Sequence, residues 1–191
     1  TNNTAVGSKA LYDNTTGFGN TAVGNATLKY NTTGKFNNAF GTEALLNNEI
    51  GTSNNAYGNN ALSHNSIGNL NIAIGHDAMG LADFANNIVA IGDSALYTNA
   101  LNHTKSYHGA FNTGIGSKAL FANTIGFNNT AMGYRSLQTN TTGNSNTAVG
   151  VEVLTANKFG DKNTGLGFEA LVSNTLGNSN VGIGSESLLL N

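Results

Sequence analysis

The residues best suited to recognition gather in one short stretch of a chain that is otherwise poor in charge. Only 9% of the 191 residues are Asp, Glu, Lys or Arg. Yet residues 100–108 contain His103, Lys105, Tyr107 and His108. Two imidazoles, a phenol ring and an ammonium group suit contacts with a sugar ring or a protein pocket. These four residues are therefore the candidate contact for a receptor or glycan.

Two other interpretations of this stretch stay open. It can be a tolerated surface bulge, because insertions in repeat proteins map to loops. His103 and His108 can also be metal ligands, although the sequence specifies no further ligand beside them. The preceding segment is atypical as well, with Ala-Asp-Phe-Ala at residues 82–85. Two neighbouring departures from the pattern favour a contact region.

The rest of the chain indicates no catalytic group. It has no cysteine to act as a nucleophile, and its ten acidic residues are spaced singly, whereas paired acid–base catalysis needs two carboxyl groups held together. Gly-x-Gly sequences such as residues 165–167 belong to a repeat and form no phosphate loop. Glycosylation sequons such as Asn14-Thr15-Thr16 are interpreted as turn residues. We expect a non-enzymatic protein with no cofactor and no metal.

A repeat that extends over the whole chain carries these side chains. Its marker is the glycine that closes sequences such as Asn-Thr-Ala-Val-Gly at residues 20–24. The marker recurs eleven times, with nine intervals of 17 residues and one of 24. The longer interval places seven extra residues within 100–108, so the candidate contact residues lie in an insertion. The fixed period predicts a single array of stacked units over residues 1–191. The markers are Gly7, Gly24, Gly41, Gly58, Gly75, Gly92, Gly116, Gly133, Gly150, Gly167 and Gly184.

Two adjacent columns of different size precede the marker. Two positions before it, every repeat has alanine or glycine, as at Ala22 and Ala39. One position before it, every repeat has a larger apolar residue, as at Val23 and Phe40. Because neighbouring residues of a strand point to opposite faces, the two columns cannot share one side. We expect backbones to crowd at the small column and the large column to need its own apolar cover.

Three further columns follow the same period. Leucine, or Met79, stands four residues after the marker, and asparagine stands seven after it, except at Ala82. A second glycine usually comes three residues after that asparagine, and a second asparagine column lies four residues before the marker. Asparagine and glycine favour turns, and stacked asparagine amides can bond to one another. Each coil is expected to run as turn, short strand, glycine bend, second short strand and turn.

The predicted fold is therefore all-β, a parallel β-solenoid or β-roll of about eleven 17-residue coils. Helix is the competing prediction, because Ala-Leu occurs in most units. The recurring glycines leave segments too short for a stable helix. With strands about 4.8 Å apart, eleven coils would make a rod roughly 50 Å long.

The overall composition restricts the partners. A formal net charge of −2 argues against a nucleic-acid surface, and no apolar run of 18 residues predicts a membrane span. Hydrophobic residues make up 39% of the chain and fall on a fixed period, which indicates an ordered protein. The sequence starts and stops inside repeats, so we expect a segment of a longer fibre protein.

The columns resemble the head repeats of trimeric autotransporter adhesins, the YadA-like heads, which also occur in phage and viral fibre proteins. The matching phrases are Asn-Thr-Ala-Val-Gly at 20–24 and 146–150, Asn-Ile-Ala-Ile-Gly at 71–75, and Ser-Lys-Ala-Leu at 8–11 and 117–120. The resemblance implies a left-handed β-roll, a homotrimer, a location on a bacterial surface or virion fibre, and attachment to a host protein or glycan. The coil here is slightly longer than is usual in that family.

An independent argument also favours a trimer. A flattened 17-residue coil has room for the small column inside, which leaves the larger apolar column facing outward and in need of a partner. A single-chain, three-sided β-helix that encloses both columns is the rival geometry. An ice-binding solenoid is the alternative function, because threonine recurs three residues before the marker, although asparagine, isoleucine and valine interrupt it. A polysaccharide-cleaving β-helix is disfavoured, because no acids cluster.

Overall fold

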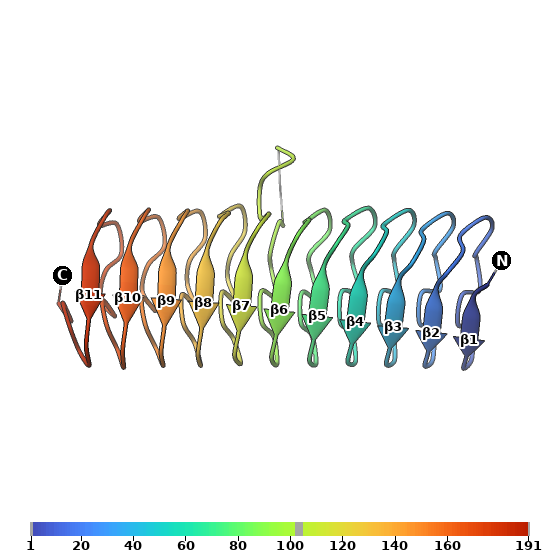
Figure 1. The fold of residues 1–191 in the computed structure, drawn as a ribbon, viewed down its shortest axis with the longest axis horizontal. Coiled ribbons are helices and arrows are strands. Elements are labelled where there is room, and N and C mark those ends of the chain that lie inside the picture. Colours follow the sequence, from blue (N-terminus) through green and yellow to red (C-terminus); the bar gives the residue numbers. More distant parts are fainter. Residues whose placement is uncertain (1, 102–104, 191) are drawn as a thin grey trace.

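The computed structural model describes residues 2–101 and 105–190 and shows an all-β rod of stacked coils (Figure 1). Each coil contributes one strand of three residues to a single sheet. The predicted β-solenoid of about eleven coils is confirmed, and no helix occurs among the residues described. The strands are β1 (Thr4–Val6), β2 (Thr21–Val23), β3 (Asn38–Phe40), β4 (Asn55–Tyr57), β5 (Ile72–Ile74), β6 (Val89–Ile91), β7 (Thr113–Ile115), β8 (Thr130–Met132), β9 (Thr147–Val149), β10 (Thr164–Leu166) and β11 (Val181–Ile183).

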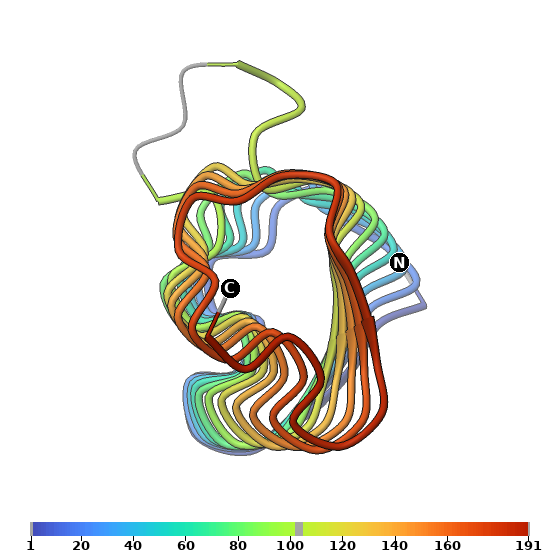
Figure 2. The same cartoon turned by 90° about the vertical axis from the view of Figure 1, so that its left-hand side faces the viewer.

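The strands pair in parallel and strictly in chain order, from β1 to β11. Equivalent positions of neighbouring repeats lie opposite each other, as Ala22 does with Ala39. The register holds across the 24-residue interval, where Ala90 of β6 pairs with Gly114 of β7. The seven extra residues therefore leave the sheet undisturbed. Seen along the rod, successive coils have the same outline and are gradually displaced from one another, and residues 105–108 project from that outline (Figure 2).

Glycine is required at the marker for two reasons. All eleven marker glycines have positive φ, between 116° and 143°, which L-residues with a side chain rarely adopt. The coils also approach closely there, since a Cβ on Gly75 would lie 2.5 Å from the carbonyl oxygen of Gly92. The marker thus turns the chain sharply and lets the next coil rest directly against it.

The expected second strand in each coil is not present. The Ala-Leu segment after the marker forms turns, as in residues 25–30. Two residues of each such segment have positive φ, for example Ala26 at 55° and Leu28 at 50°. A segment that alternates between left-handed and other backbone conformations cannot form an extended β-strand. The segment still stacks in register, because Leu28 donates its N–H to the carbonyl of Ala44 in the next coil at 3.0 Å.

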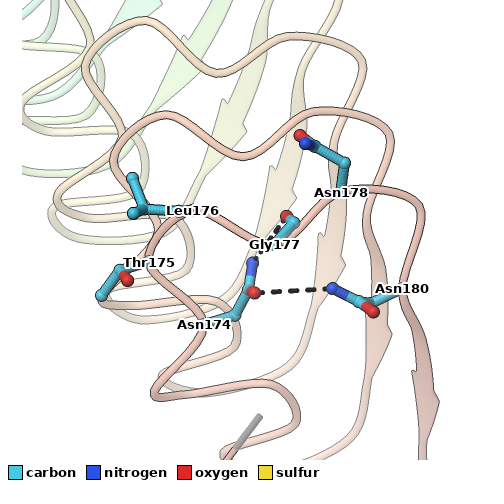
Figure 3. A pocket seen from close by; sticks show the side chains of 6 residues that line it. All are labelled: Asn174, Thr175, Leu176, Gly177, Asn178 and Asn180. Atoms are coloured by element: carbon cyan, nitrogen blue, oxygen red, sulfur yellow. Dashed lines mark hydrogen bonds between the residues drawn. The ribbon is translucent and has the colours of Figure 1, made fainter.

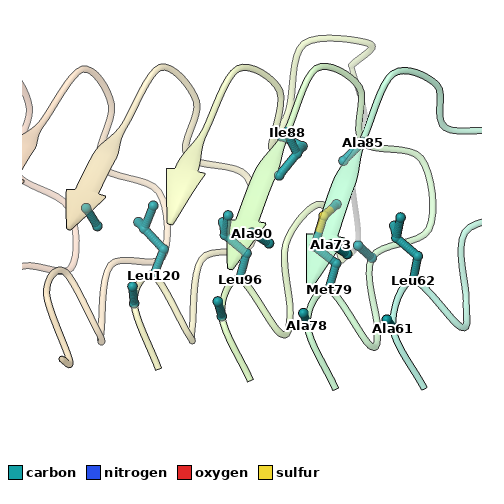
Figure 4. Packing of buried hydrophobic residues seen from close by; sticks show 14 of the residues in the cluster. Ala61, Leu62, Ala73, Ala78, Met79, Ala85, Ile88, Ala90, Leu96 and Leu120 are labelled. Atoms are coloured by element: carbon teal, nitrogen blue, oxygen red, sulfur yellow. The ribbon is translucent and has the colours of Figure 1, made fainter. Parts of the chain in front are cut away.

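The interior is narrow and filled by two of the predicted columns. The alanines at the centre of the strands, such as Ala73 and Ala90, are fully buried. They lie over the leucine column, in which Leu62, Met79 and Leu96 are fully buried (Figure 4). Gly114 shows how tight this contact is, because a Cβ there would lie 3.0 Å from Cδ1 of Leu96. The prediction that the small column marks crowding is confirmed.

The larger apolar column faces outward along the whole sheet. Ile74 is 40% exposed and Leu166 is 46% exposed, while the alanines or glycines beside them are buried. The rival geometry, in which a single coil encloses both columns, is therefore wrong for this row. We call it the outer apolar row: Val6, Val23, Phe40, Tyr57, Ile74, Ile91, Ile115, Met132, Val149, Leu166 and Ile183.

The asparagines seven residues after the marker form a buried hydrogen-bonded ladder, as predicted, which we call the inner ladder. In seven bonds of 2.7–3.0 Å, the Nδ2 of one asparagine donates to Oδ1 of the asparagine one coil earlier. The same amide nitrogen donates to the carbonyl of the glycine three residues later, as Asn31 does to Gly34 at 3.1 Å. The turns that carry this asparagine are therefore bonded within their own coil, and these seven bonds join them to a neighbouring coil.

The asparagines four residues before the marker form a second ladder with a different pattern. Asn20 accepts the backbone N–H of Asn37 at its Oδ1, at 2.9 Å. Its Nδ2 donates 2.8 Å to the carbonyl of Gly34 in the next coil. These buried amides replace backbone pairing where the chain is too irregular for a strand.

Sequence reasoning missed a third, shorter ladder six residues before the marker. There, Asn69 accepts the backbone N–H of Thr52 at 2.8 Å, and Asn86 accepts that of Asn69 at 2.8 Å. Asn144 and Asp161 continue the arrangement in later coils. Asparagine and aspartate both serve, because only the side-chain oxygen is needed as an acceptor.

Candidate functional site

The insertion begins after Asn99 and ends at Gly109, as the spacing predicted. Asn99 Nδ2 donates to the Gly109 carbonyl at 2.8 Å, and this bond corresponds to the Asn31–Gly34 bond of an ordinary coil. The Gly109 N–H donates 3.2 Å to the carbonyl of Ile125, and the Phe111 N–H donates 3.3 Å to that of Asn86. Both neighbouring coils thus hold the base of the insertion, and the extra residues leave the ladder intact.

Three of the four predicted contact residues lie together on the insertion, and His103 lies outside the described residues. The described part, residues 105–108, stands off the rod at the margin above β6 and β7, away from the strands (Figures 1 and 2). Lys105 Nζ lies 5.5 Å from the centroid of the Tyr107 ring. The Tyr107 and His108 rings meet edge to face, with centroids 5.1 Å apart.

Hydrogen bonding to Tyr107, followed by the Coulombic interaction with it, raises the pKa of Lys105 above its ordinary value. The lysine is exposed, so it remains a solvated cation at neutral pH. The Tyr107 side chain is 42% exposed. The insertion therefore presents a positive charge beside a partly open aromatic ring, which is an arrangement suited to a polar ligand with a flat face.

Phe127 is the contact that sequence reasoning missed. Its ring centroid lies 5.2 Å from that of Tyr107, at an interplanar angle of 72°. It belongs to the next coil, in a position where most repeats have a polar residue. That departure from the repeat was the available signal. Phe127 anchors Tyr107 against the rod and restricts the orientation of the ring.

The atypical segment at residues 82–85 has a packing role. Ala82 and Ala85 are buried in the core cluster, and Figure 4 shows Ala85. Asp83 is partly buried, and its Oδ1 accepts a 3.0 Å hydrogen bond from Ser66 Oγ of the preceding coil. The two alanines therefore do not enlarge the contact surface of the insertion.

Two aspartate side chains contact one histidine at a place that the sequence did not suggest. His76 Nδ1 lies 3.3 Å from Asp77 Oδ2 and 3.3 Å from Asp93 Oδ1, because the histidine and Asp93 occupy the same position in consecutive coils. In residues 2–101 and 105–190, no group of three or more His, Cys, Asp or Glu side chains could hold a metal ion. Both are histidine–carboxylate contacts, and the side chains of His76 and Asp93 are 59% and 53% exposed.

The sequon asparagines Asn14 and Asn31 are part of the inner ladder. Asn31 Nδ2 donates 2.7 Å to Asn14 Oδ1, and Asn14 Nδ2 donates 3.0 Å to the Gly17 carbonyl. An attached glycan would replace one N–H of these amides and would have no room in the ladder. The interpretation of these residues as structural turn residues is supported.

A hollow of about 340 Å³ lies at the turn of the last described coil (Figure 3). Asn174 Nδ2 donates to the Gly177 carbonyl at 3.2 Å, and Asn180 Nδ2 lies 3.5 Å from Asn174 Oδ1. These residues form the repeating turn, and the described residues place no further coil over it. Among the described residues, the hollow is therefore the uncovered side of the last turn of this kind.

No helix long and apolar enough to cross a membrane occurs in the described ranges. Comparison with protein-family models, with curated proteins and with solved structures gives no significant match.

Proposed function

We propose that this chain is a structural and adhesive segment of an extracellular homotrimeric fibre, either a bacterial surface adhesin or a phage or viral fibre. The outer apolar row is the observation that carries the proposal. Eleven consecutive coils place a large apolar side chain on the outside of the sheet, in register, over the whole array. Monomeric proteins rarely expose a continuous apolar stripe of that length.

Packing of identical rows against one another would cover this stripe. Burial is worth about 25 cal/mol per Å² of apolar surface, so the gain grows with every coil. Three parallel copies can bring three equivalent rows to a common axis without any change in the coil. The resemblance to trimeric adhesin heads supports three copies and a left-handed coil.

Solution mass tests the assembly. Light scattering of the unmodified chain should give three times 19.6 kDa. Ile74→Asp and Ile91→Asp should each reduce the mass to that of a monomer or unfold the chain, because each places a charge in the seam. Ile50→Asp is the matched control, because Ile50 is 51% exposed and lies outside the row. A monomer mass for the unmodified chain would refute the trimer.

The insertion is the proposed attachment site for a host protein or glycan. It is the one addition to the repeat, and it presents Lys105, Tyr107 and His108 at the margin of the rod. In a trimer, three copies would surround the fibre and allow multivalent attachment through individually weak contacts. His103 belongs to the same proposal on the sequence alone.

Deletion of residues 102–108 tests this site without disturbing the stack. The shortened chain would read Asn99-Ala100-Leu101-Gly109, which restores the ordinary Asn-x-x-Gly turn. Its melting temperature should stay close to that of the unmodified chain, while its attachment to host cells should fall. The double variant Lys105→Ala/Tyr107→Ala should show the same loss, and Lys158→Ala/Phe159→Ala, on another coil, should not. Unchanged attachment after the deletion would leave the insertion a tolerated bulge.

One observation favours ice binding as a second candidate. The sheet register places Thr113, Thr130, Thr147 and Thr164 side by side on consecutive strands. They share the outward face with the apolar row, but Asn38, Ile72 and other residues interrupt the threonines in the first half. A thermal-hysteresis measurement on the unmodified chain tests this candidate directly. If ice freezes and melts at the same temperature in the presence of the protein, ice binding is excluded.

A further inference from the structure

A row of hollows lies along the first half of the rod, over coils that include Asp13 at one end and Leu101 at the other. It consists of three adjoining hollows of about 430, 330 and 180 Å³. Asn47 lines all three, while Glu49 joins the first to the second. We call this surface the lateral groove. It lies outside the candidate contact residues of the insertion and outside the outer apolar row.

The repeat itself does not produce this groove. Six residues after the marker, the first half carries Tyr30, Asn47, His64 and Leu81, whose side chains form the walls. The five repeats that follow carry only small residues at the same position, namely Thr98, Ala122, Thr139, Ala156 and Ser173, and the last repeat has Leu190. A solenoid needs nothing at this position beyond what the second half has. The larger residues in the first half therefore require an explanation other than stacking.

The lining of the lateral groove is strongly acidic. Five carboxylates line the three hollows, and no lysine or arginine does: Asp13, Glu43, Glu49, Asp77 and Asp83. Within the described residues, neither Glu43 nor Glu49 has an ion-pair partner within 4 Å. The carboxylates are spread along the rod and do not converge as a metal site would. A spread of negative charge fits an elongated cationic occupant.

The chain itself shows how a cation lies at this surface. Lys29 Nζ donates 2.7 Å to Tyr30 Oη and lies 4.2 Å from the centroid of the Tyr30 ring. Tyr30 lines the first hollow together with Asp13 and Glu49. The face of an aromatic ring attracts ammonium and guanidinium groups, and carboxylates beside the ring attract the same cations. Lys29 is thus an internal example of the proposed contact.

We propose that the lateral groove binds an extended polypeptide segment that carries lysine or arginine side chains. Asp13, Glu49 and Asp83 lie on the first, third and fifth coils, which spans roughly 19 Å at about 4.8 Å per coil, the length of about six extended residues. Asn47 and Ser66 line the groove between them and can bond to the backbone of that segment. The partner is therefore a basic stretch of another protein.

Titration of the intact chain with a fluorescent hexa-arginine peptide tests this inference, and hexa-citrulline serves as the uncharged probe. The double variant Glu49→Gln/Asp83→Asn should weaken hexa-arginine binding by about 2- to 5-fold for each carboxylate removed. Glu169→Gln/Glu186→Gln removes the same charge from the second half and should change binding less than 2-fold. Hexa-citrulline should bind at least ten times more weakly than hexa-arginine.

Three results would overturn the inference. Equal weakening by the two double variants would mean that only the net charge attracts the peptide. Equal binding of the two peptides would remove the role of the carboxylates. Binding of a neutral cello-oligosaccharide that is lost in Glu49→Gln/Asp83→Asn would assign the groove to glycans. The inference does not rest on attachment by the insertion, so the variant lacking residues 102–108 should bind hexa-arginine unchanged.

Discussion

Asn65 and Ala82 occupy the same position in consecutive coils, and Asn65 Oδ1 is buried without a hydrogen-bond partner among the residues described. In other coils, that oxygen accepts the amide of the next asparagine, as Asn48 Oδ1 does from Asn65 Nδ2 at 3.0 Å. Ala82 has no side-chain amide that could donate to this oxygen. The inner ladder is therefore divided into one part ending at Asn65 and another beginning at Asn99.

Ala85 explains why Ala82 is not asparagine. In ordinary coils the residue three after the ladder asparagine is glycine, and a Cβ on it would overlap Oδ1 of that asparagine, as at Gly68 with Asn65. The coil with Ala82 has Ala85 at the glycine position, and both residues are buried. The two alanines thus replace an asparagine and a glycine together. The Cβ of Ala85 takes the space that the side-chain amide of an asparagine at position 82 would fill.

This coupling predicts a strongly non-additive pair of substitutions. Ala82→Asn alone should destabilise the chain, because the new amide meets the Cβ of Ala85. Ala82→Asn/Ala85→Gly should rejoin the ladder, satisfy Asn65 Oδ1 and stabilise the chain by about 1–2 kcal/mol relative to the unmodified protein. Denaturant unfolding of the four proteins gives the coupling energy. Additive effects within about 0.5 kcal/mol would contradict the explanation.

The leucine column should reject β-branched residues of equal volume. All eleven of its members, including Met79, have positive φ, between 50° and 55°. A β-branched residue is strained in that region, so Leu96→Ile should cost about 1–3 kcal/mol beyond any repacking. Leu96→Met is the control, because Met79 already occupies this column, and it should cost less than about 1.5 kcal/mol. Equal melting temperatures of the two variants would contradict this prediction.

Marker glycines should differ in how well they tolerate substitution by alanine, depending on whether another coil is stacked on them. Gly75→Ala should be severely destabilising, by more than about 4 kcal/mol, because the Cβ would lie 2.5 Å from the carbonyl oxygen of Gly92. Gly184 has a similar φ, 116°, but nothing within 4 Å of its Cβ position. Gly184→Ala should therefore show only the backbone strain, about 1–3 kcal/mol. Similar losses for the two variants, by thermal unfolding, would argue that conformation alone requires glycine.

The Tyr107 hydroxyl should control the ionisation of Lys105. Hydrogen bonding to it raises the pKa of Lys105. Tyr107→Phe keeps the ring beside Phe127 but removes the hydroxyl, so the Lys105 pKa should fall toward its ordinary value. Because the raised pKa belongs to the folded state, its stabilising contribution is present below the ordinary pKa and disappears as the pH rises through the raised one. NMR titration of the lysine side chains measures the shift; Lys29, which contacts Tyr30, is the internal reference and should not change.

Much of this architecture could be predicted from the sequence, because a solenoid repeats one set of local constraints. The 17-residue period gave the register of every strand pair, including Ala90 with Gly114 across the insertion. The asparagine and glycine columns predicted the ladder, and the bond from Asn99 to Gly109 is found where the spacing placed it. The strand pairs and the asparagine–asparagine bonds join equivalent positions, so the alignment of the repeats already states which of these residues meet.

Contacts between unlike positions were decided only by the tertiary structure. The Ala-Leu segment appeared extended in sequence but forms left-handed turns, because the coil must close within 17 residues while keeping leucine inside. Tyr107 of the insertion contacts Phe127 of the next coil, and no single column contains both residues. The lateral groove likewise needs several columns at once. A repeat determines what stacks on what, whereas the path of the chain around each coil determines which columns lie side by side.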